Sequence, residues 1–209
     1  MHRLTEEIIA SRDWRMRELE ALKKMSVVTL SKSSEEVRKQ YNRMCVPYIY
    51  AHWEGFIVQS FRKMISYINS LNIPKKNIRN ELYAFSLVDV IRPLAGKQSF
   101  DQVRNFVEKF VTDYEQKFYM DTSVLTAKSN LNYAQIEDIL NHFGMSNNLT
   151  VYKQWINQMI NIRNKIAHGE NGISIDYTYI ESAVGKMYEM YDIIILEIND
   201  YLEHKRYMK

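Results

Sequence analysis

The chain has 209 residues, of which 46% are hydrophobic and 25% are charged; this balance supports a well-filled core and excludes an intrinsically disordered chain. The formal charge is only +3, so binding to nucleic acid through overall charge is excluded and any such contact must be local. Only 6 Gly and 3 Pro are present, which favours long helices over many short strands.

These properties predict a single cytoplasmic domain over residues 1–209. No stretch approaches the roughly 18 apolar residues of a membrane span, and the start of the chain carries acids and lacks the apolar core of a signal peptide. Cys45 is the only cysteine, so it cannot form an internal disulfide, and its apolar neighbours favour a buried thiol. We therefore expect a reducing compartment and no membrane partner.

The first half of the chain predicts two long helices. Apolar residues recur at helical spacing over residues 4–25, which indicates an amphipathic first helix. Ser33, with Glu36 three positions on, has the form of a capping box, and the apolar pattern behind it reaches Ile68. Pro47 lies inside this pattern, so we expect a kink or a break in the second helix there.

Two further helices are predicted in the middle of the chain. A third helical stretch follows a basic cluster and is expected to end near Pro93 and Gly96. Ser99 and Gln102 give another capping-box signal, and the apolar positions behind it extend a fourth helix to Tyr114.

The rest of the chain continues the helical pattern. Residues 119–130 show no sustained period and are predicted to form a loop. Helices are expected over residues 133–143, 150–168 and 178–203, and Gly169 can end the second of these in a left-handed conformation. The sequence thus predicts an all-helical bundle of at least five helices with essentially no sheet.

The most informative stretch lies at the end of the 150–168 helix and reads Arg163-Asn164-Lys165-Ile166-Ala167-His168-Gly169. It resembles the signature of the HEPN superfamily, whose ribonucleases carry an Arg, commonly followed by a polar residue, and then a His with four to six residues between the Arg and the His. Here Asn164 is the polar residue and four residues intervene.

Two other stretches carry the same resemblance. Residues 48–56 are similar to the aromatic and acidic stretch in an earlier helix of one HEPN subgroup, and the segment Ser129-Asn130-Leu131 is similar to that subgroup as well. Glu170 stands two positions after His168, where another subtype has a tyrosine that a partner nucleotidyltransferase modifies. This departure argues against that subtype.

The resemblance implies an HEPN-like bundle that forms a two-fold dimer. Residues five apart on a helix are rotated by about 140° and displaced by about 7.5 Å, so Arg163 and His168 do not share one face. A dimer that pairs this helix with its copy would bring both pairs of side chains to one cleft.

Such a cleft suits metal-independent cleavage of RNA. Histidine has an ordinary pKa of about 6.5 and can take or give the proton of a ribose 2′-hydroxyl or a leaving oxygen. We assign this role to His168, and Arg163 would clamp the phosphate. Asn164 could orient the phosphate or the imidazole, while Glu54 or His52 could fix the rotamer of Arg163.

Each assignment has a structural alternative. Arg163 could be an ion-paired surface residue, and His168 could be a residue favoured at a helix C-terminus by the helix dipole. Glu54 and His52 could be ordinary packed or surface residues, and we rank His52 lowest. The aromatic residues Tyr48, Tyr50, Trp53 and Phe56 fit a core better than a base-stacking platform, because they lie within an apolar helical pattern.

We assign RNA contacts to five basic residues, although such clusters are usually solvated surface: Lys165, Arg62, Lys63, Lys75 and Lys76. No Cys and His spacing for a metal site, phosphate loop or nucleophile elbow is present, so no metal or cofactor is expected.

Two functions follow as hypotheses. The first is an endoribonuclease of toxin or antiviral-defence type that leaves a cyclic phosphate, with RNA as substrate and an antitoxin or defence component as a further partner. The second is a noncatalytic HEPN module that binds RNA or nucleotides, or serves as a dimerisation scaffold.

Overall fold

The computed structural model describes residues 1–91, 96, 98–125 and 130–209. Its regular elements are helices, and within these ranges the only extended pairings are two isolated bridges, Pro74 with Lys117 and Ile78 with Met208. The prediction of an all-helical bundle with at least five helices is confirmed.

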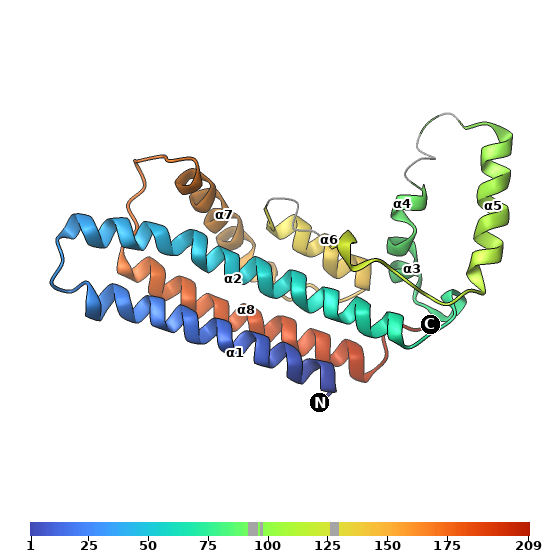
Figure 1. The fold of residues 1–209 in the computed structure, drawn as a ribbon, viewed down its shortest axis with the longest axis horizontal. Coiled ribbons are helices and arrows are strands. Elements are labelled where there is room, and N and C mark those ends of the chain that lie inside the picture. The colour runs from blue at the N-terminus through green and yellow to red at the C-terminus, as the bar shows by residue number, and fades with distance from the viewer. Residues whose placement is uncertain (92–95, 97, 126–129) are drawn as a thin grey trace.

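Three long helices form the body of the molecule: α1 (Arg3–Lys24), α2 (Glu35–Ser70) and α8 (Tyr177–Glu203). Figure 1 shows them side by side, with α2 and α8 running in one direction and α1 in the other. The first helix continues into a short π-helical turn, Met25–Thr29, before the chain reverses. All three pairs of these helices are in contact, so each helix buries one broad face against the other two.

The core between these helices is rich in aromatic side chains from α2. Trp53, Phe56 and Phe61 are all 0% exposed, and the ring centre of Phe56 lies 4.3 Å from that of Tyr191 on α8. The expectation that the aromatic stretch packs in the core therefore holds for Tyr50, Trp53 and Phe56, whereas Tyr48 is exposed.

Helix α2 runs through Pro47 without a break. Of the expected kink or break, the break is wrong: the flanking residues Cys45, Val46 and Ile49 are buried, and this packing holds the helix together across the missing hydrogen bond. The residue that caps the start of α2 is Ser34 rather than Ser33, and its hydroxyl accepts a hydrogen bond from the Val37 N–H.

Two shorter helices lie over the body. Helix α6 (Tyr133–Phe143) begins with a capping box formed by Asn132 and Gln135, and a single 3-10 turn, Thr150–Tyr152, leads into α7 (Lys153–Ala167). Helix α7 packs on α2 and also contacts α6. Figure 1 shows α7 crossing the N-terminal half of α2. This crossing sets the position of the residues at the end of α7.

The other elements gather at the opposite end of the body. The predicted third stretch is two short helices, α3 (Asn80–Ser86) and α4 (Val88–Ile91), and the expected stop at Pro93 lies outside the described residues. Helix α5 (Phe100–Tyr114) has the predicted Ser99 and Gln102 capping box. Two 3-10 turns complete the list, Lys75–Asn77 and Thr122–Val124, and the second lies within the stretch expected to be a loop.

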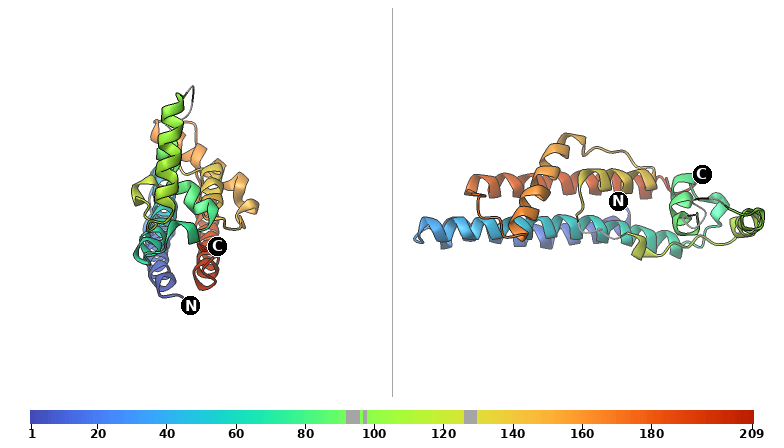
Figure 2. Two further views of the ribbon diagram at one scale, coloured as in Figure 1. Left: turned by 90° about the vertical axis from the view of Figure 1, so that its right-hand side faces the viewer. Right: turned by 90° about the horizontal axis from the view of Figure 1, so that it is seen from above.

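Helix α5 extends away from the body, as Figure 2 shows in the view from the end of the molecule. None of its residues is buried, and Phe100 is 79% exposed. Its closest ring contacts join Phe110 and Tyr114 to Tyr83 of α3, at 5.9 and 5.8 Å. Of the helices in the described ranges, none combines the length and apolar character that a membrane span requires.

A glycine inside a helix and a glycine that caps a helix end should respond to alanine in opposite directions. Gly185 lies in the middle of α8 with open space around a Cβ, so Gly185→Ala should raise the free energy of unfolding by about 0.5–1 kcal/mol. Gly144 ends α6 at φ +62, so Gly144→Ala should lower it by about 1 kcal/mol. Urea unfolding of both variants measures the two changes in the free energy of unfolding. Equal changes would contradict the positions of Gly185 inside α8 and of Gly144 at the end of α6.

Candidate functional site

The Arg163 to Gly169 string forms the end of α7. His168 is the last residue of the helical hydrogen-bond pattern, and its N–H donates to the carbonyl of Asn164 over 2.9 Å. Gly169 then takes φ +79, and the N–H of Glu170 returns to the carbonyl of Lys165 at 3.0 Å, as in a Schellman turn. The turn leaves His168 exposed at the tip of the helix.

The guanidinium of Arg163 is held by three neighbours. Its Nη1 donates to the side-chain oxygens of Asn130 at 3.0 Å and of Asn164 at 2.8 Å. Its carbon lies 4.6 Å from the centre of the Tyr50 ring, which is within the range of a cation–π interaction. Arg163 is half-buried, unlike the exposed His168. The predicted orienting residue Asn164 therefore contacts the arginine rather than the imidazole.

Tyr50 links this arginine to Glu54. The hydroxyl of Tyr50 accepts a hydrogen bond from the Leu131 N–H at 2.6 Å, and both Tyr50 and Leu131 are 1% exposed. Burial raises the pKa of Tyr50, and the nearby Glu54 carboxylate raises it further. Glu54 stands four residues after Tyr50 on α2, next to the phenol whose ring lies under Arg163, and its supporting role remains a prediction.

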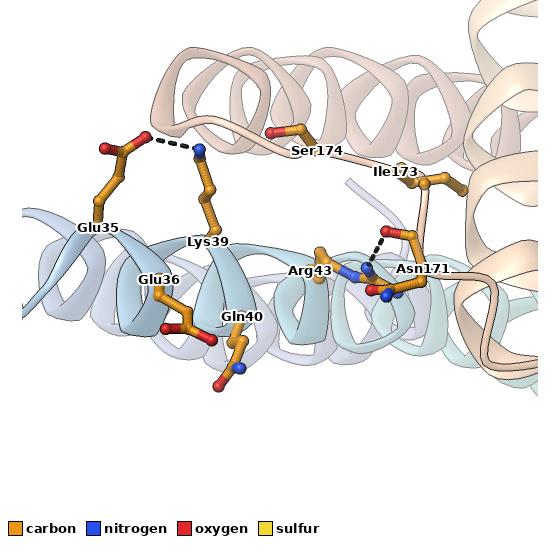
Figure 3. Close-up of a pocket in the computed structure, with 9 residues that line it drawn as sticks. Glu35, Glu36, Lys39, Gln40, Arg43, Asn171, Ile173 and Ser174 are labelled. Carbon is orange, nitrogen blue, oxygen red and sulfur yellow. Dashed lines mark hydrogen bonds and ion pairs between the residues drawn. The ribbon is translucent and has the colours of Figure 1, made fainter.

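The loop after His168 is held by Arg43 of α2. Its guanidinium donates to the carbonyls of Glu170 at 2.5 Å and of Asn171 at 3.0 Å. A groove with a volume of about 570 Å³ lies next to this contact, between the start of α2 and residues 171–174. Figure 3 shows the residues that line it. Glu35 and Lys39 form an ion pair at 2.6 Å along its edge. One wall of the groove thus begins three residues after His168.

His52 lies on another side of α2. It is 7% exposed, its Nε2 lies 3.2 Å from a carboxylate oxygen of Glu18, and its ring packs against Trp14 of α1 and Tyr48. Residues two apart on a helix are rotated by about 200°, so His52 faces α1 where Tyr50 faces α7. The expectation that His52 fixes the rotamer of Arg163 is wrong for this reason.

The predicted RNA-binding residues do not form one patch around the site. Lys165 is exposed on α7 beside Arg163, but the other four lie on the C-terminal part of α2 or beyond its end. Arg62 is twelve residues from Tyr50, which is about 18 Å along a helix. The three lysines are paired with carboxylates: Lys63 with Glu7, Lys75 with Asp113 and Lys76 with Glu115. Only Lys165 lies next to the pair.

The all-helical bundle, with the Arg163 to His168 string at the end of α7, agrees with a domain of the HEPN type. The family model described as RiboL-PSP-HEPN matches residues 10–201, and the chain belongs to this family. The comparisons with curated proteins and with solved structures find no match. The match covers α2 and α7 in full and most of α1 and α8, so it includes the elements that build the site.

Sequence reasoning missed two residues of the site. The sequence predicts Tyr50 as a core residue, and it is buried. Its ring also lies against the Arg163 guanidinium, which the sequence pattern does not indicate. Asn130 received no role, although the segment that contains it is one of those that resemble an HEPN subgroup. Ser129 of that segment lies outside the described residues.

The burial of His52 makes the stability of the fold depend on pH. Burial lowers the pKa of His52 below its ordinary value of 6.5, against the opposing attraction of Glu18. Below that pH the unfolded chain binds the proton more readily, so the free energy of unfolding should fall as the pH falls through the region under 6.5. In His52→Asn this part of the pH dependence should be lost.

Urea unfolding between about pH 7.5 and pH 5 measures this dependence for the wild type and for His52→Asn. His204→Asn is the matched control, because the side chain of His204 is 72% exposed. Identical slopes in wild type and His52→Asn would contradict the buried, uncharged state of His52.

Proposed function

We propose that the protein is a metal-independent endoribonuclease in which Arg163 and His168 act at a cleft between two protomers. The observation that carries the proposal is the state of Arg163: neutral amides and an aromatic ring fix its guanidinium, and within the described part of the chain no salt bridge neutralises it. Both of its hydrogen bonds there leave from Nη1, so Nη2 and Nε are available to a phosphate.

In this mechanism the attacking group belongs to the RNA. One His168 takes the proton of the ribose 2′-hydroxyl, and the 2′-oxygen forms a bond to the phosphorus. The bond to the 5′-oxygen breaks, and that oxygen is protonated by the second His168. The products are a 2′,3′-cyclic phosphate and a 5′-hydroxyl end. Arg163 stabilises the additional negative charge on the phosphoryl oxygens in the transition state.

A dimer supplies what one protomer does not. Arg163 turns toward α2 while His168 stands exposed at the tip of α7, so a two-fold axis beside the end of α7 would place each histidine near the arginines of both chains. Lys165, exposed between them in sequence, would contact the RNA backbone. Arg62, Lys63, Lys75 and Lys76 would be reached only by a longer RNA.

The biological role that fits this chemistry is that of a toxin or an antiviral-defence effector in the cytoplasm, held inactive by an antitoxin or another defence component. A cleavage site that needs neither cofactor nor metal is active whenever its cleft is accessible. Control would then have to come from a partner that covers it. Co-purification from the native host, analysed by mass spectrometry, tests for such a partner.

The alternative is a noncatalytic HEPN module that binds RNA or nucleotides, or acts as a dimerisation scaffold. The exposed position of His168, with its backbone but no side-chain hydrogen bond recorded in the described residues, is the feature that favours this alternative. Incubation of the purified protein with RNA separates the two functions.

Removing either member of the pair should abolish RNA cleavage. Arg163→Ala and His168→Ala should each lower the rate by about 10²–10⁴, because neither side chain can take over the role of the other. His168 is exposed, so His168→Ala should change the free energy of unfolding little. Arg163 is half-buried, so Arg163→Ala should change it modestly. Chelators should leave wild-type cleavage unchanged, and RNA with a 2′-deoxy substitution at the cut site should resist.

Gel assays with end-labelled RNA measure these rates, and mass spectrometry identifies the cyclic phosphate. Cleavage by both variants at the wild-type rate, or an obligatory magnesium ion, would exclude this mechanism and favour the noncatalytic module. A contaminating nuclease would be recognised by its indifference to both substitutions, and His204→Ala, at an exposed histidine, is the control that should keep the wild-type rate.

The protein should be a dimer whose interface includes the end of α7. Light scattering at micromolar concentration should give twice the chain mass of 25.0 kDa. A spin label or cross-linker attached next to His168 should detect its copy at short range. A monomer in solution, or two α7 ends far apart in a dimer, would remove the composite cleft.

A further inference from the structure

We propose that Asn130 and Tyr50 are positioning residues that fix the Arg163 guanidinium for phosphate binding without reducing its charge. The inference rests on the proposed function and adds two residues to it. These residues come from separate parts of the chain, α2 and the segment before α6, and both contact the Arg163 guanidinium.

The first step concerns geometry. The guanidinium carbon of Arg163 lies over the Tyr50 ring, 4.6 Å from its centre, and the side-chain oxygen of Asn130 accepts a hydrogen bond from Nη1 at 3.0 Å. A ring beneath the guanidinium carbon and an acceptor at one nitrogen together restrict both the tilt and the rotation of the guanidinium. The edge formed by Nη2 and Nε is therefore presented in one orientation.

The second step concerns the rigidity of the two anchors. Tyr50 is 1% exposed, and its hydroxyl accepts the hydrogen bond of the Leu131 N–H at 2.6 Å. Two residues further on, the N–H of Tyr133 donates to the side chain of Asn157 on α7 at 3.2 Å. The segment that carries Asn130 is thus tied to α2 through Tyr50 and to α7 through Asn157. An acceptor on such a segment can hold a long side chain in one rotamer.

The third step concerns charge. Asn130 and Asn164 are neutral, so their hydrogen bonds orient the cation while leaving its full charge for a phosphate. The lysines predicted to bind RNA on and beyond α2 have the opposite arrangement, because Lys63, Lys75 and Lys76 are each paired with a carboxylate. Replacing Asn130 by Asp keeps the acceptor and adds the neutralising charge.

These steps give two different kinetic signatures. Asn130→Ala frees the guanidinium, so kcat for RNA should fall about tenfold with little change in KM. Asn130→Asp keeps the orientation but opposes the phosphate, so KM should rise about tenfold while kcat stays closer to that of the wild type. Tyr50→Leu removes the ring and should lower kcat. Tyr50→Phe keeps the ring, so its kcat should stay closer to that of the wild type.

A double-mutant cycle separates positioning from a general loss of structure. In an Arg163→Lys background, the flexible ammonium lacks the planar fork, so Asn130→Ala should reduce kcat by much less than in the wild type. Additive effects in the two backgrounds would overturn the proposal. Tyr201→Phe is the matched control for Tyr50→Phe, because Tyr201 is also a buried tyrosine and is 0% exposed.

A readout without RNA keeps the two proposals distinguishable. In ¹⁵N spectra of the whole protein, a guanidinium held on one face and one edge should show slow rotation and separate Nη signals, assigned by their loss in Arg163→Lys. Asn130→Ala should merge these signals while the thermal unfolding curve stays cooperative. Fast rotation of Arg163 in the wild type, or unchanged signals in Asn130→Ala, would overturn the positioning role.

The outcomes for the two proposals differ. If Arg163→Ala cuts RNA like the wild type, the endoribonuclease proposal fails, whatever the spectra show. If Arg163→Ala is inactive while Asn130→Ala retains both the kcat and the Nη signals of the wild type, the endoribonuclease stands and the positioning proposal fails.

Discussion

Helix α2 must satisfy packing partners on several sides at once, and the site depends on this constraint. Its successive residues face α1, α7 and α8, with His52 toward α1, Tyr50 toward α7 and Phe56 against Tyr191 of α8. A rotation of α2 that improved one contact would disturb the others, because protein cores are close-packed. The ring under Arg163 is therefore as firmly placed as the core itself.

Much of the fold follows from local patterns, and the site follows only in part. The helical period of the apolar residues, the Ser99 capping box and the turn at Gly169 depend on neighbours within a few positions, so the sequence predicts them well. Contacts such as Tyr50 with Arg163 join residues more than a hundred positions apart, and a period along one helix says nothing about them. The unbroken helix at Pro47 also depends on contacts that are distant in sequence, because tertiary burial outweighs the local preference of proline.

Local charge also escaped prediction. Three lysines appear in the sequence as part of a basic cluster because their acidic partners are distant along the chain. The pairs are Lys63 with Glu7, Lys75 with Asp113 and Lys76 with Glu115. Arg163 has the same formal charge but neutral partners, which makes it chemically distinct from them. In a chain with a net charge of +3, the pairing of each cation matters more for phosphate binding than the number of cations.

Pro47 has a consequence for the motion of the site. It lies between Arg43, which holds the loop after His168, and Tyr50, which supports Arg163, and these two positions are about 10.5 Å apart along the helix. Because proline has no N–H, the carbonyl of Arg43 lacks its usual helical donor, and α2 bends most easily in this turn. Bending there changes the spacing between the two supports, so the separation of arginine and histidine is coupled to the curvature of a single helical turn.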